Sequence, residues 1–365
     1  MWSLTVESGL TPKTERYNRE FLVKKEDAFK VVSPGEFIYN PMNMTLGAVD
    51  LNSMDKKVAV SGYYITMQTK ESHSNSYFVV WLKSPQAIKL YKIFATGGLT
   101  EKQRVQFPTL SSIETLVPTL PEQTCIGDFF RTLDNTIALH QRKLDGLKAI
   151  KAAYLQQMFP AAGESVPRIR FAGFEDEWEV RRLGEVAEFS KGNGYSKSDL
   201  ADQGMPIILY GRLYTKYETI IEDVDTFASM KEKSVISRGG EVIVPSSGET
   251  AEDISRASVV AKQGVILGGD LNIIRTDSTI HPAFLAITIS NGTQQKELSK
   301  RAQGKSVVHI NNSDLKEVEL LCPALPEQTA IGNFFKAVDK NIAAQQIKLD
   351  KLKQLKAAYL QKMFA

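Results

Sequence analysis

The stretch LPEQTCIGDFFRTLDNTIALHQRKLDGLKAIKAAYLQQMFP at residues 120–160 returns at residues 325–365 as LPEQTAIGNFFKAVDKNIAAQQIKLDKLKQLKAAYLQKMFA. The two copies align without a gap and are identical at 26 of 41 positions, which marks an internal repeat. Each copy ends a segment that is not itself repeated. The chain is therefore predicted to carry two different modules on matching helices, an arrangement suited to measuring the distance between two recognised objects.

Apolar residues in both copies follow alternating steps of four and three, which is the spacing of a coiled-coil seam. The predicted seam residues are Ile126, Phe130, Leu133, Ile137, His140, Leu144, Leu147, Lys151, Tyr154 and Met158 in the first copy, and Ile331, Phe335, Val338, Ile342, Gln345, Leu349, Leu352, Lys356, Tyr359 and Met363 in the second. Polar residues recur at matching seam positions, as His140 with Gln345 and Lys151 with Lys356. Because such residues commonly set register and orientation, we interpret them as pairing determinants. The alternative for His140 is that it lies at the solvent edge of the seam and has no role in pairing.

Each repeated helix carries the same start signals. Pro121 and Pro326 suit a first helical turn, and Glu122 and Glu327 place negative charge near the positive end of the helix dipole. A helix of about 35 residues is roughly 50 Å long, and alone it would expose its seam to water. The two helices are therefore expected to pair in antiparallel orientation, each following its own domain. The alternative is that each helix packs only against its own domain.

The composition of the 365-residue chain is that of a globular protein, with 42% hydrophobic residues and 14 prolines, and this length can form about two medium domains. Cys125 and Cys322 lie at different places relative to the two copies, so neither a disulfide framework nor a cysteine metal site is indicated. No run reaches the ~18–20 apolar residues of a membrane helix, and the N-terminus lacks a signal-peptide pattern. A reduced, cytoplasmic setting is expected. The net charge of +3 permits a nucleic-acid partner without requiring one.

Changes in pattern divide the chain into parts. We predict a first domain over residues 1–118, a long helix over 119–160, a linker over 161–177 that is rich in Pro, Gly and charge, a second domain over 178–323, and a second long helix over 324–365. Short apolar runs broken by turns predict mixed α and β structure in both domains. Strands are predicted at Phe37–Tyr39, Lys57–Val60, Tyr63–Thr66 and Tyr77–Trp81 in the first domain and at Glu185–Phe189, Ile207–Tyr210, Glu241–Val244, Val265–Leu267 and Leu271–Arg275 in the second, with helices at Pro85–Ile93 and Ala283–Ile289.

Three features make the chain resemble the DNA-specificity subunits of type I restriction-modification systems. They are the doubled LPEQxxIGxFF helix, the text RIRFAGFEDEWEVRRLGEV at 168–186, and FSKGNGYSK at 189–197 followed by LYGRLYTKY at 209–217. The resemblance covers nearly the whole chain, and the doubled helix is highly specific. It implies an α+β architecture, with two mixed α/β target-recognition domains joined by two long helices that form an antiparallel coiled coil.

The resemblance also implies a function. Each domain would read one half of a bipartite target in double-stranded DNA. The paired helices would act as a spacer that docks two methyltransferase subunits, and restriction subunits would join the full complex. This subunit would be non-catalytic and would bind no cofactor of its own, because S-adenosylmethionine, ATP and Mg²⁺ would be used by the partner subunits.

Catalytic motifs are incomplete in this chain. The text from Tyr39 to Met42 lacks the second proline and the aromatic residue of an adenine-methyltransferase NPP[YF] loop. Residues 304–306 resemble the end of a phosphate-binding loop, but Ser299 replaces the required glycine five residues earlier. The four histidines are isolated from cysteines and from one another, so no metal site is expected.

Loops that combine cationic, hydroxyl and amide side chains with glycine are the candidate DNA contacts, because phosphates attract cations and hydroxyl groups while base edges match polar side chains. The candidates are Lys191, Asn193, Tyr195, Lys197, Arg212, Tyr214, Lys216, Ser246, Ser247, Gln303 and Lys305 in the second domain, and Lys24, Lys25, Tyr39, Asn40 and Arg104 in the first. Any one of these residues, considered alone, is also consistent with an ordinary surface residue that contacts only solvent. Neutralising Lys191 and Arg212 together is expected to weaken DNA binding and flatten its salt dependence.

The first domain departs from the second at its start. Moving Trp178 back by the repeat offset of 205 residues places the matching start about 27 residues before Met1. The first domain is therefore expected to lack the opening strand and the first polar loop, either because it is naturally shorter or because the chain is truncated or rearranged. A missing strand would leave backbone groups unpaired at a sheet edge.

Two other classes of function fit the sequence. One is a protein-interaction scaffold or modulator of a restriction-modification complex, whose DNA reading is impaired by the altered first domain. The other is an enzyme, such as a nuclease with an unrecognised site. Electrophoretic mobility shifts of DNA with the methyltransferase partner would distinguish the scaffold from a DNA-reading subunit. Metal-dependent cleavage of DNA by the isolated chain would support the enzyme.

Overall fold

The chain forms two compact units in the computed structural model, which describes residues 1–13, 29–97, 103–302, 304 and 307–364. Unit 1 comprises Met1–Arg142 with Gln346–Ala365, and unit 2 comprises Lys143–Gln345. The two long helices cross this boundary, so each unit contains the first part of one helix and the last part of the other. The boundary between the units therefore lies within the two long helices, which were predicted from the sequence as parts separate from the domains.

Unit 1 places short antiparallel strands beside short helices. Strand β4 lies between β5 and β7, while β3 pairs with β6 and β1 with β2. The elements are β1 (Trp2–Thr5), β2 (Gly9–Pro12), β3 (Phe29–Val32), β4 (Phe37–Tyr39), the 3-10 helix η2 (Met44–Leu46), β5 (Val49–Leu51), β6 (Val58–Ser61), β7 (Ile65–Met67), α1 (Asn75–Trp81), α2 (Pro85–Phe94), α3 (Phe107–Ser111) and the start of α4 (Leu120–Gln157). Aromatic residues of β4, α1 and α2 fill the core around Phe130 of α4.

Residues 75–81 form helix α1, so the strand predicted at Tyr77–Trp81 is wrong. The run Tyr-Phe-Val-Val-Trp has the aromatic and β-branched residues that are typical of strands. Tyr77 and Trp81 lie about one helical turn apart and are both buried in the core of unit 1, which is the spacing of a helix face. The helix predicted over Pro85–Ile93 is confirmed by α2.

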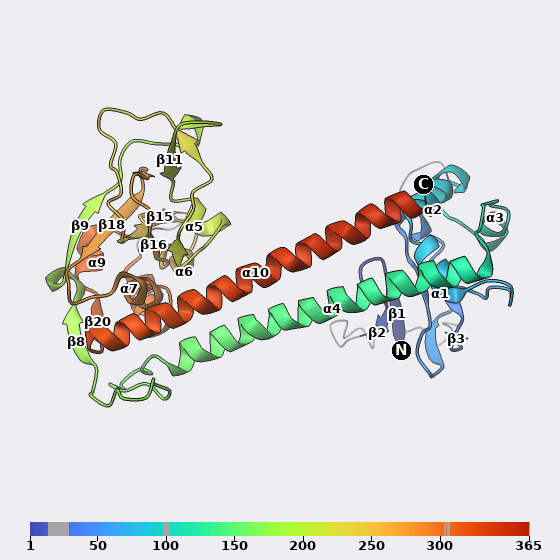
Figure 1. Cartoon of the computed structure of the whole chain (residues 1–365), viewed down its shortest axis with the longest axis horizontal. Coiled ribbons are helices and arrows are strands. Elements are labelled where there is room, and N and C mark those ends of the chain that lie inside the picture. The colour runs from blue at the N-terminus through green and yellow to red at the C-terminus, as the bar shows by residue number, and fades with distance from the viewer. Residues whose placement is uncertain (14–28, 98–102, 303, 305–306, 365) are drawn as a thin grey trace. The chain divides into compact units, whose positions relative to one another are not determined.

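Unit 2 is built on a five-stranded sheet in the order β12-β16-β14-β18-β9, with a second sheet in the order β10-β13-β11-β17 and the pairs β15–β19 and β8–β20. Helix α7, whose residues from Ala283 to Ile289 are all buried, lies between the five-stranded sheet and the start of α10 (Figure 1). The strands are β8 (Glu179–Arg182), β9 (Ala187–Lys191), β10 (Leu200–Ala201), β11 (Met205–Ile208), β12 (Ile220–Ile221), β13 (Phe227–Ala228), β14 (Glu241–Pro245), β15 (Ser247–Gly248), β16 (Ser258–Val260), β17 (Ile266–Leu267), β18 (Leu271–Thr276), β19 (Val308–His309) and β20 (Glu319–Cys322). The helices are η4 (Leu183–Glu185), η5 (Lys197–Asp199), α5 (Arg212–Thr215), α6 (Ala251–Ile254), α7 (Pro282–Ile289), α8 (Gly292–Arg301), α9 (Asn312–Lys316) and α10 (Leu325–Met363). The strands predicted for this domain correspond to β9, β11, β14, β17 and β18, with small shifts of their bounds.

Helices α4 and α10 pair in antiparallel orientation, as predicted (Figure 1). In unit 1, Phe129 near the start of α4 contacts Tyr359 near the end of α10, with ring centroids 5.0 Å apart. In unit 2, Phe334 near the start of α10 contacts Tyr154 near the end of α4, with centroids 5.1 Å apart. The repeat relates these two contacts residue for residue. The start of each helix therefore lies against the end of the other.

The seam lysines form ion pairs across the helix pair. Lys151 Nζ lies 2.6 Å from a carboxylate oxygen of Asp339 in unit 2, and Lys356 Nζ lies 2.5 Å from one of Asp134 in unit 1. These two pairs are again equivalent under the repeat. Because all four side chains remain partly exposed, each pair contributes at most about 1 kcal/mol. Their main effect is to favour one register of the helices over others.

The residues predicted for the helix interface lie along one stripe of each helix. Their burial follows the predicted spacing: Phe130, Leu133, Leu144, Ile331, Phe335, Gln345 and Leu349 are buried, Ile126, Ile137, His140, Leu147, Tyr154, Val338, Ile342 and Leu352 are half-buried, and Tyr359 is 38% exposed. A polar residue, Gln345, is thus among the buried members of the stripe. Burial along the stripe therefore varies from fully buried to exposed.

A repeated glutamine joins each long helix to a short helix of the domain that precedes it. In unit 1, the backbone N–H of Ser74, where α1 begins, donates to Oε1 of Gln123 at 2.9 Å. In unit 2, the backbone N–H of His281, where α7 begins, donates to Oε1 of Gln328 at 2.9 Å. Each glutamine also donates to the carbonyl of the proline five residues before it. Both glutamine side chains are buried, and each satisfies a backbone donor that would otherwise be unpaired at a helix start. We call this attachment of a long helix to a short helix, through Gln123 in unit 1 and Gln328 in unit 2, the joint.

A repeated glycine lets the same helices approach closely. A Cβ on Gly127 would lie 2.3 Å from Oγ of Ser76 in α1. A Cβ on Gly332 would lie 2.9 Å from the ring of His281 and 3.2 Å from Cβ of Ala283 in α7. The absence of a side chain therefore brings each long helix against its short partner, and the phenylalanine three residues later enters the core.

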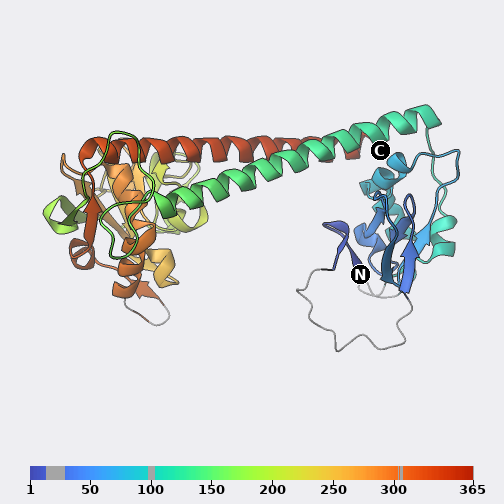
Figure 2. The same cartoon turned by 90° about the horizontal axis from the view of Figure 1, so that it is seen from below.

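The segment predicted as a linker, 161–177, packs against the rest of unit 2, to which it belongs (Figure 2, green loop). Nε and Nη2 of Arg170 donate to the two carboxylate oxygens of Glu327 at 2.8 and 2.7 Å, and the Glu327 side chain is only 2% exposed. Phe171 lies against Phe334 with ring centroids 5.9 Å apart, and Trp178 is buried in the core. The bidentate ion pair and the aromatic contacts attach this segment to the start of α10.

Replacing Gly127 with alanine is expected to lower the free energy of unfolding by about 1–3 kcal/mol, because the new Cβ overlaps Ser76. Gly332→Ala is expected to cause a smaller loss, since its nearest neighbours are side-chain atoms at 2.9 Å or more, whereas a Cβ on Gly127 would also lie 2.5 Å from the backbone carbonyl carbon of Ser76. Gly146→Ala is the control, because it lies in the same helix as Gly127 with no atom within 4 Å of the added Cβ, and better helix propensity there should raise stability by up to about 1 kcal/mol. Urea unfolding measures all three, and equal effects of Gly127→Ala and Gly146→Ala would contradict the proposed close approach.

Candidate nucleic-acid interface

The loop that follows β9 presents polar side chains on the surface of unit 2. Nζ of the exposed Lys191 donates to Oδ1 of Asn311 at 3.3 Å. Nδ2 of Asn193 donates to the carbonyl of Lys233 at 2.8 Å. The loop is thus connected to two segments that are distant in the sequence, and Lys191 and Asn193 both remain exposed to solvent.

Tyr195 anchors this loop and is largely buried, with 8% of its surface exposed. Its hydroxyl lies 2.5 Å from Oγ of Ser234 and accepts the backbone N–H of Lys231 at 2.8 Å. The ammonium of Lys231 lies 4.6 Å from the centre of the Tyr195 ring, a cation–π contact. The structure therefore assigns Tyr195 a positioning role in the loop, in place of the predicted exposed contact with DNA.

Three lysines gather beside this anchor, and we call Lys197, Lys231 and Lys233 the basic loop cluster. All three side chains are exposed. Nζ of Lys231 lies 2.6 Å from Asp199, and this hydrogen bond, with one from the backbone of Ser196, lowers the pKa of the Asp199 carboxyl. Lys231 and Lys233 were not among the predicted contacts, and their only sequence signal is the short charged text MKEK at 230–233. The cluster offers positive charge where phosphates could approach.

Arg212 is not available to DNA in this structure, so the prediction for this residue needs correction. Its side chain is 8% exposed and donates to the carboxylates of Asp225 and Glu218. Lys216 also pairs with Asp225, at 2.8 Å. Lys216 first and then Arg212 hold the pKa of the Asp225 carboxyl well below its usual range. Neighbouring acids thus neutralise the charge of Arg212, which stabilises the fold around α5.

The residues predicted around Ser246 connect two segments of unit 2. The hydroxyl of Tyr214 donates to the carbonyl of Ser247 at 2.7 Å, and burial raises the pKa of this tyrosine. Ser247 pairs with His309 where β15 meets β19. Ser246 is buried, and its carbonyl accepts the backbone N–H of Ile310 at 3.1 Å. These residues hold a turn in place, and Ser247 remains half-buried.

The candidates in unit 1 are less exposed than predicted. Tyr39 lies wholly in the core, so it cannot reach DNA from the surface in this structure. Oδ1 of Asn40 accepts the backbone N–H of Met42 at 3.0 Å, which closes a local turn. Arg104 is exposed and its backbone pairs with Thr96. The remaining predicted contacts, Lys24, Lys25, Gln303 and Lys305, lie outside the described residues.

The two cysteines are free thiols, with Cys125 exposed and Cys322 buried. Burial raises the pKa of the Cys322 thiol to about 12. Among the described residues, no group of three His, Cys, Asp or Glu side chains is placed to hold a metal ion. No helix in the described part of the chain is both long enough and apolar enough to cross a membrane.

Two mixed α/β domains of different sequence, each joined by the same contacts to a shared antiparallel helix pair, define a class of two-domain recognition protein. The family model of the type I restriction modification DNA specificity domain matches residues 11–149 and 175–354. These segments include most of both domains and of both long helices. The chain belongs to this family of type I restriction-modification specificity subunits.

Relatives with the same description are distant in sequence. The type I restriction enzyme MjaVIII specificity subunit of Methanocaldococcus jannaschii is 20% identical over 256 residues, which cover 67% of this chain and 60% of the relative. The putative MjaX specificity subunit of the same organism is 23% identical over 219 residues, covering 55% of this chain and 48% of the relative. The matched region therefore spans less than two thirds of the length of these relatives.

Solved structures share the fold. The S subunit of a type I restriction-modification system from M. genitalium has a TM-score of 0.62 at 14% identity, with 93% of this chain and 84% of that chain covered. A chain from a structure of the type I R-M system, described for its complex assembly and conformational transition, has a TM-score of 0.53 at 18% identity and covers 94% and 84%. The two-domain architecture on paired helices is thus that of an S subunit.

Replacing Lys197 and Lys233 with glutamine is expected to weaken DNA binding at every sequence and to reduce the salt slope of log K by about 2, because each phosphate contact contributes about 0.9. Fluorescence anisotropy with duplex DNA over a series of salt concentrations measures the slope. Arg212→Met is the contrasting variant, since removal of this buried cation should lower stability and leave the slope of the folded protein unchanged. A normal slope in the double lysine variant would remove the basic loop cluster from the interface.

Proposed function

We propose that this specificity subunit reads a bipartite target in double-stranded DNA, with one recognition domain in each unit. The observation that carries the proposal is the repeated joint. Two domains of different sequence are attached through equivalent glutamine and glycine contacts to the starts of two equivalent helices. Because the two domains differ in sequence but are attached in the same way, we expect each to read a different half-site. The basic loop cluster supports phosphate contact by the domain in unit 2.

We further propose a fixed gap between the half-sites, which the two long helices support. Helix α4 continues for 38 residues and α10 for 39, each from one unit into the other. Ion pairs and aromatic contacts hold their register at both ends of the pair. Because a paired helix is stiff along its axis, we expect the complex to tolerate little change in the spacing of the target.

The helix pair also supports docking of two methyltransferase subunits. Ile150 on α4 is 51% exposed, and Leu355, its equivalent on α10, is 45% exposed. Exposed apolar side chains at equivalent positions would offer the same contact twice. In this proposal the subunit itself is non-catalytic. Methyl transfer with S-adenosylmethionine and ATP- and Mg²⁺-dependent cleavage belong to methyltransferase and restriction partners.

A scaffold or modulator with impaired DNA reading is the second candidate function. It is favoured by one observation in unit 1, where the residues just before α4 are exposed and leave backbone donors without partners among the described residues. Mobility shifts with DNA duplexes and the assembled methyltransferase complex distinguish the two candidates. A shift with a defined sequence supports reading, and its absence supports the scaffold.

The spacing of the target tests the proposed reading. Genome-wide mapping of methylated adenines, with and without the gene, should show a split motif with a constant gap. Duplexes in which this gap is lengthened or shortened should then bind the assembled complex about tenfold or more weakly, comparable to the loss of a base contact. Equal binding to half-sites at any spacing would contradict a fixed spacer.

The stoichiometry of the methyltransferase tests the proposed docking. Ile150→Asp and Leu355→Asp are each expected to remove one of two methyltransferase subunits, because a charge replaces an apolar contact at one of two equivalent places. The double variant should bind neither. Native mass spectrometry of the complex measures the stoichiometry, with the exposed Asn135→Asp on α4 as a control for added charge. Full complexes with all variants would place the docking surface elsewhere.

A further inference from the structure

The repeat places matching side chains at the two joints. In unit 1, Phe364 at the end of α10 lies against Phe130 of α4 and Tyr77 of α1, with ring centroids 6.0 and 5.7 Å apart. In unit 2, Phe159 at the end of α4 lies against Phe335 of α10 and against Phe284 of α7, at 6.4 and 5.9 Å. The two units can therefore be compared residue by residue at this place.

In unit 2, the segment that follows α4 covers the joint. Arg170 pairs with the buried Glu327, and Phe171 covers Phe334. Trp178 lies edge-on to Phe159 at 5.9 Å and also contacts the aromatic ring on α7. Strand β8 then pairs antiparallel with β20, the residues just before α10. One short segment thus supplies a cation, two aromatic side chains and a strand.

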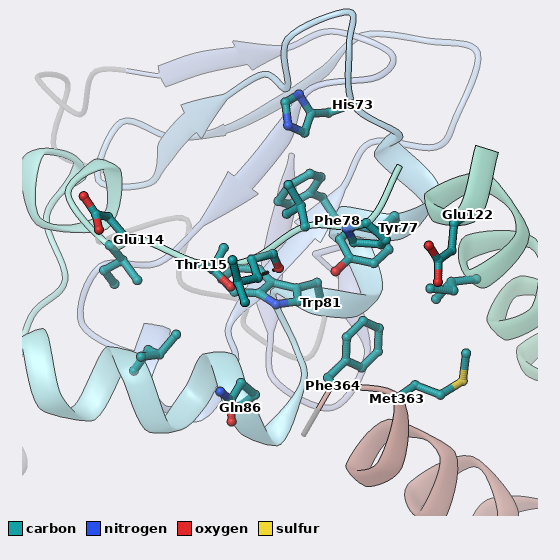
Figure 3. Close-up of a pocket in the computed structure, with 16 residues that line it drawn as sticks. His73, Tyr77, Phe78, Trp81, Gln86, Glu114, Thr115, Glu122, Met363 and Phe364 are labelled. Carbon is teal, nitrogen blue, oxygen red and sulfur yellow. Dashed lines mark hydrogen bonds between the residues drawn. The ribbon is translucent and has the colours of Figure 1, made fainter. Parts of the chain in front are cut away.

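The equivalent face of unit 1 is open. A hollow of about 1110 Å³ is lined by aromatic residues of α1, by the residues before α4, and by the end of α10 (Figure 3). Glu122 on its rim is exposed, whereas its equivalent Glu327 is 1% exposed. Met363 is 41% exposed, whereas its equivalent Met158 is 3% exposed. Among the described residues, the Glu122 side chain has no hydrogen bond or ion pair.

One pair of equivalent residues away from the hollow is about equally exposed in the two units. Leu120 and its equivalent Leu325, at the first positions of the long helices, are 43% and 40% exposed. The two helix starts are therefore similarly solvated away from the hollow. The extra exposure of Glu122 and Met363 is therefore not a general property of the start and end of the helices in unit 1.

An unpaired stretch of backbone borders the hollow. Residues 114–117 are the equivalents of strand β20, and all four are exposed, Leu116 to 96%. No backbone N–H of these residues donates a hydrogen bond within the described part of the chain. Their equivalents in β20 pair with β8 from Glu179 to Arg182. A segment outside any helix or strand, with free backbone donors beside an apolar hollow, is a place where a strand can be added.

We propose that this face of unit 1 is a docking site for a polypeptide segment of a partner protein with the chemistry of residues 164–182. The segment would place an arginine on Glu122, an aromatic side chain on Phe129, and a tryptophan in the hollow beside Tyr77 and Phe364. Its following residues would add a strand to residues 114–117. The acidic rim, the aromatic walls and the open backbone together match these groups, and unit 2 shows how one segment engages all of them. This site is independent of which DNA sequence the domains read.

A synthetic peptide with the sequence of residues 164–182, labelled with fluorescein, tests the proposal on the full chain. We expect saturable binding by fluorescence anisotropy and a rise in the melting temperature of the protein, since a ligand of the folded state stabilises it. Alanine in place of the peptide's Arg170 or Trp178 should weaken binding about tenfold or more, the effect of losing a charge-assisted bidentate contact or a buried aromatic anchor. Glu122→Gln in the protein should weaken binding of the unmodified peptide to a similar extent, whereas the exposed Glu252→Gln in unit 2 should not.

Three results would overturn the proposal. The first is no binding at millimolar peptide. The second is equal affinity for the wild-type protein and Glu122→Gln, which would show that the peptide binds elsewhere, for example by displacing its own counterpart in unit 2. The third is self-association of the chain in sedimentation that Leu116→Asp abolishes, because the open face would then belong to a second copy of this chain.

Discussion

The close approach of each long helix to a short helix of its domain is the constraint on which the rest of the structure depends. Gly127 and Gly332 remove the side chains that would separate the helices, and Gln123 and Gln328 then reach the backbone at the start of the short helix. The following phenylalanine can enter the core only at this separation. Packing of this kind is sensitive to single methyl groups, so the joint positions each domain on its helix far more rigidly than a loop would.

Sequence periodicity predicted the helix pair because a seam is a local pattern that repeats over many turns. The antiparallel orientation followed from the order of the parts, and the α+β class from short apolar runs. The packed segment around Arg170 was predicted only as a linker, because its partner Glu327 is 157 residues away. A strand was expected where α1 forms, since an aromatic and β-branched run fits both a strand and the buried face of a short helix.

The candidate DNA contacts were predicted by residue type and loop position, and type alone cannot show what surrounds a side chain. Arg212 has the chemistry of a phosphate contact, yet Glu218 and Asp225 follow it closely in the sequence and enclose it in the fold. These nearby acidic residues could have indicated that the charge of Arg212 is neutralised within the fold. Tyr195 and Tyr39 are polar only at their tips, and the fold buries both rings. Lys231 and Lys233 joined the basic loop cluster through tertiary contacts that no local pattern shows.

The equivalence of the two joints has a consequence for inheritance. The repeated glutamine and glycine contacts involve only the first turn of a short helix and its backbone, so this part of the attachment is the same for two domains of different sequence. A crossover between the repeated segments of two such genes would exchange one whole domain and leave both joints intact. The chain would then acquire a new binding preference in a single genetic event, without any further change in how its parts assemble.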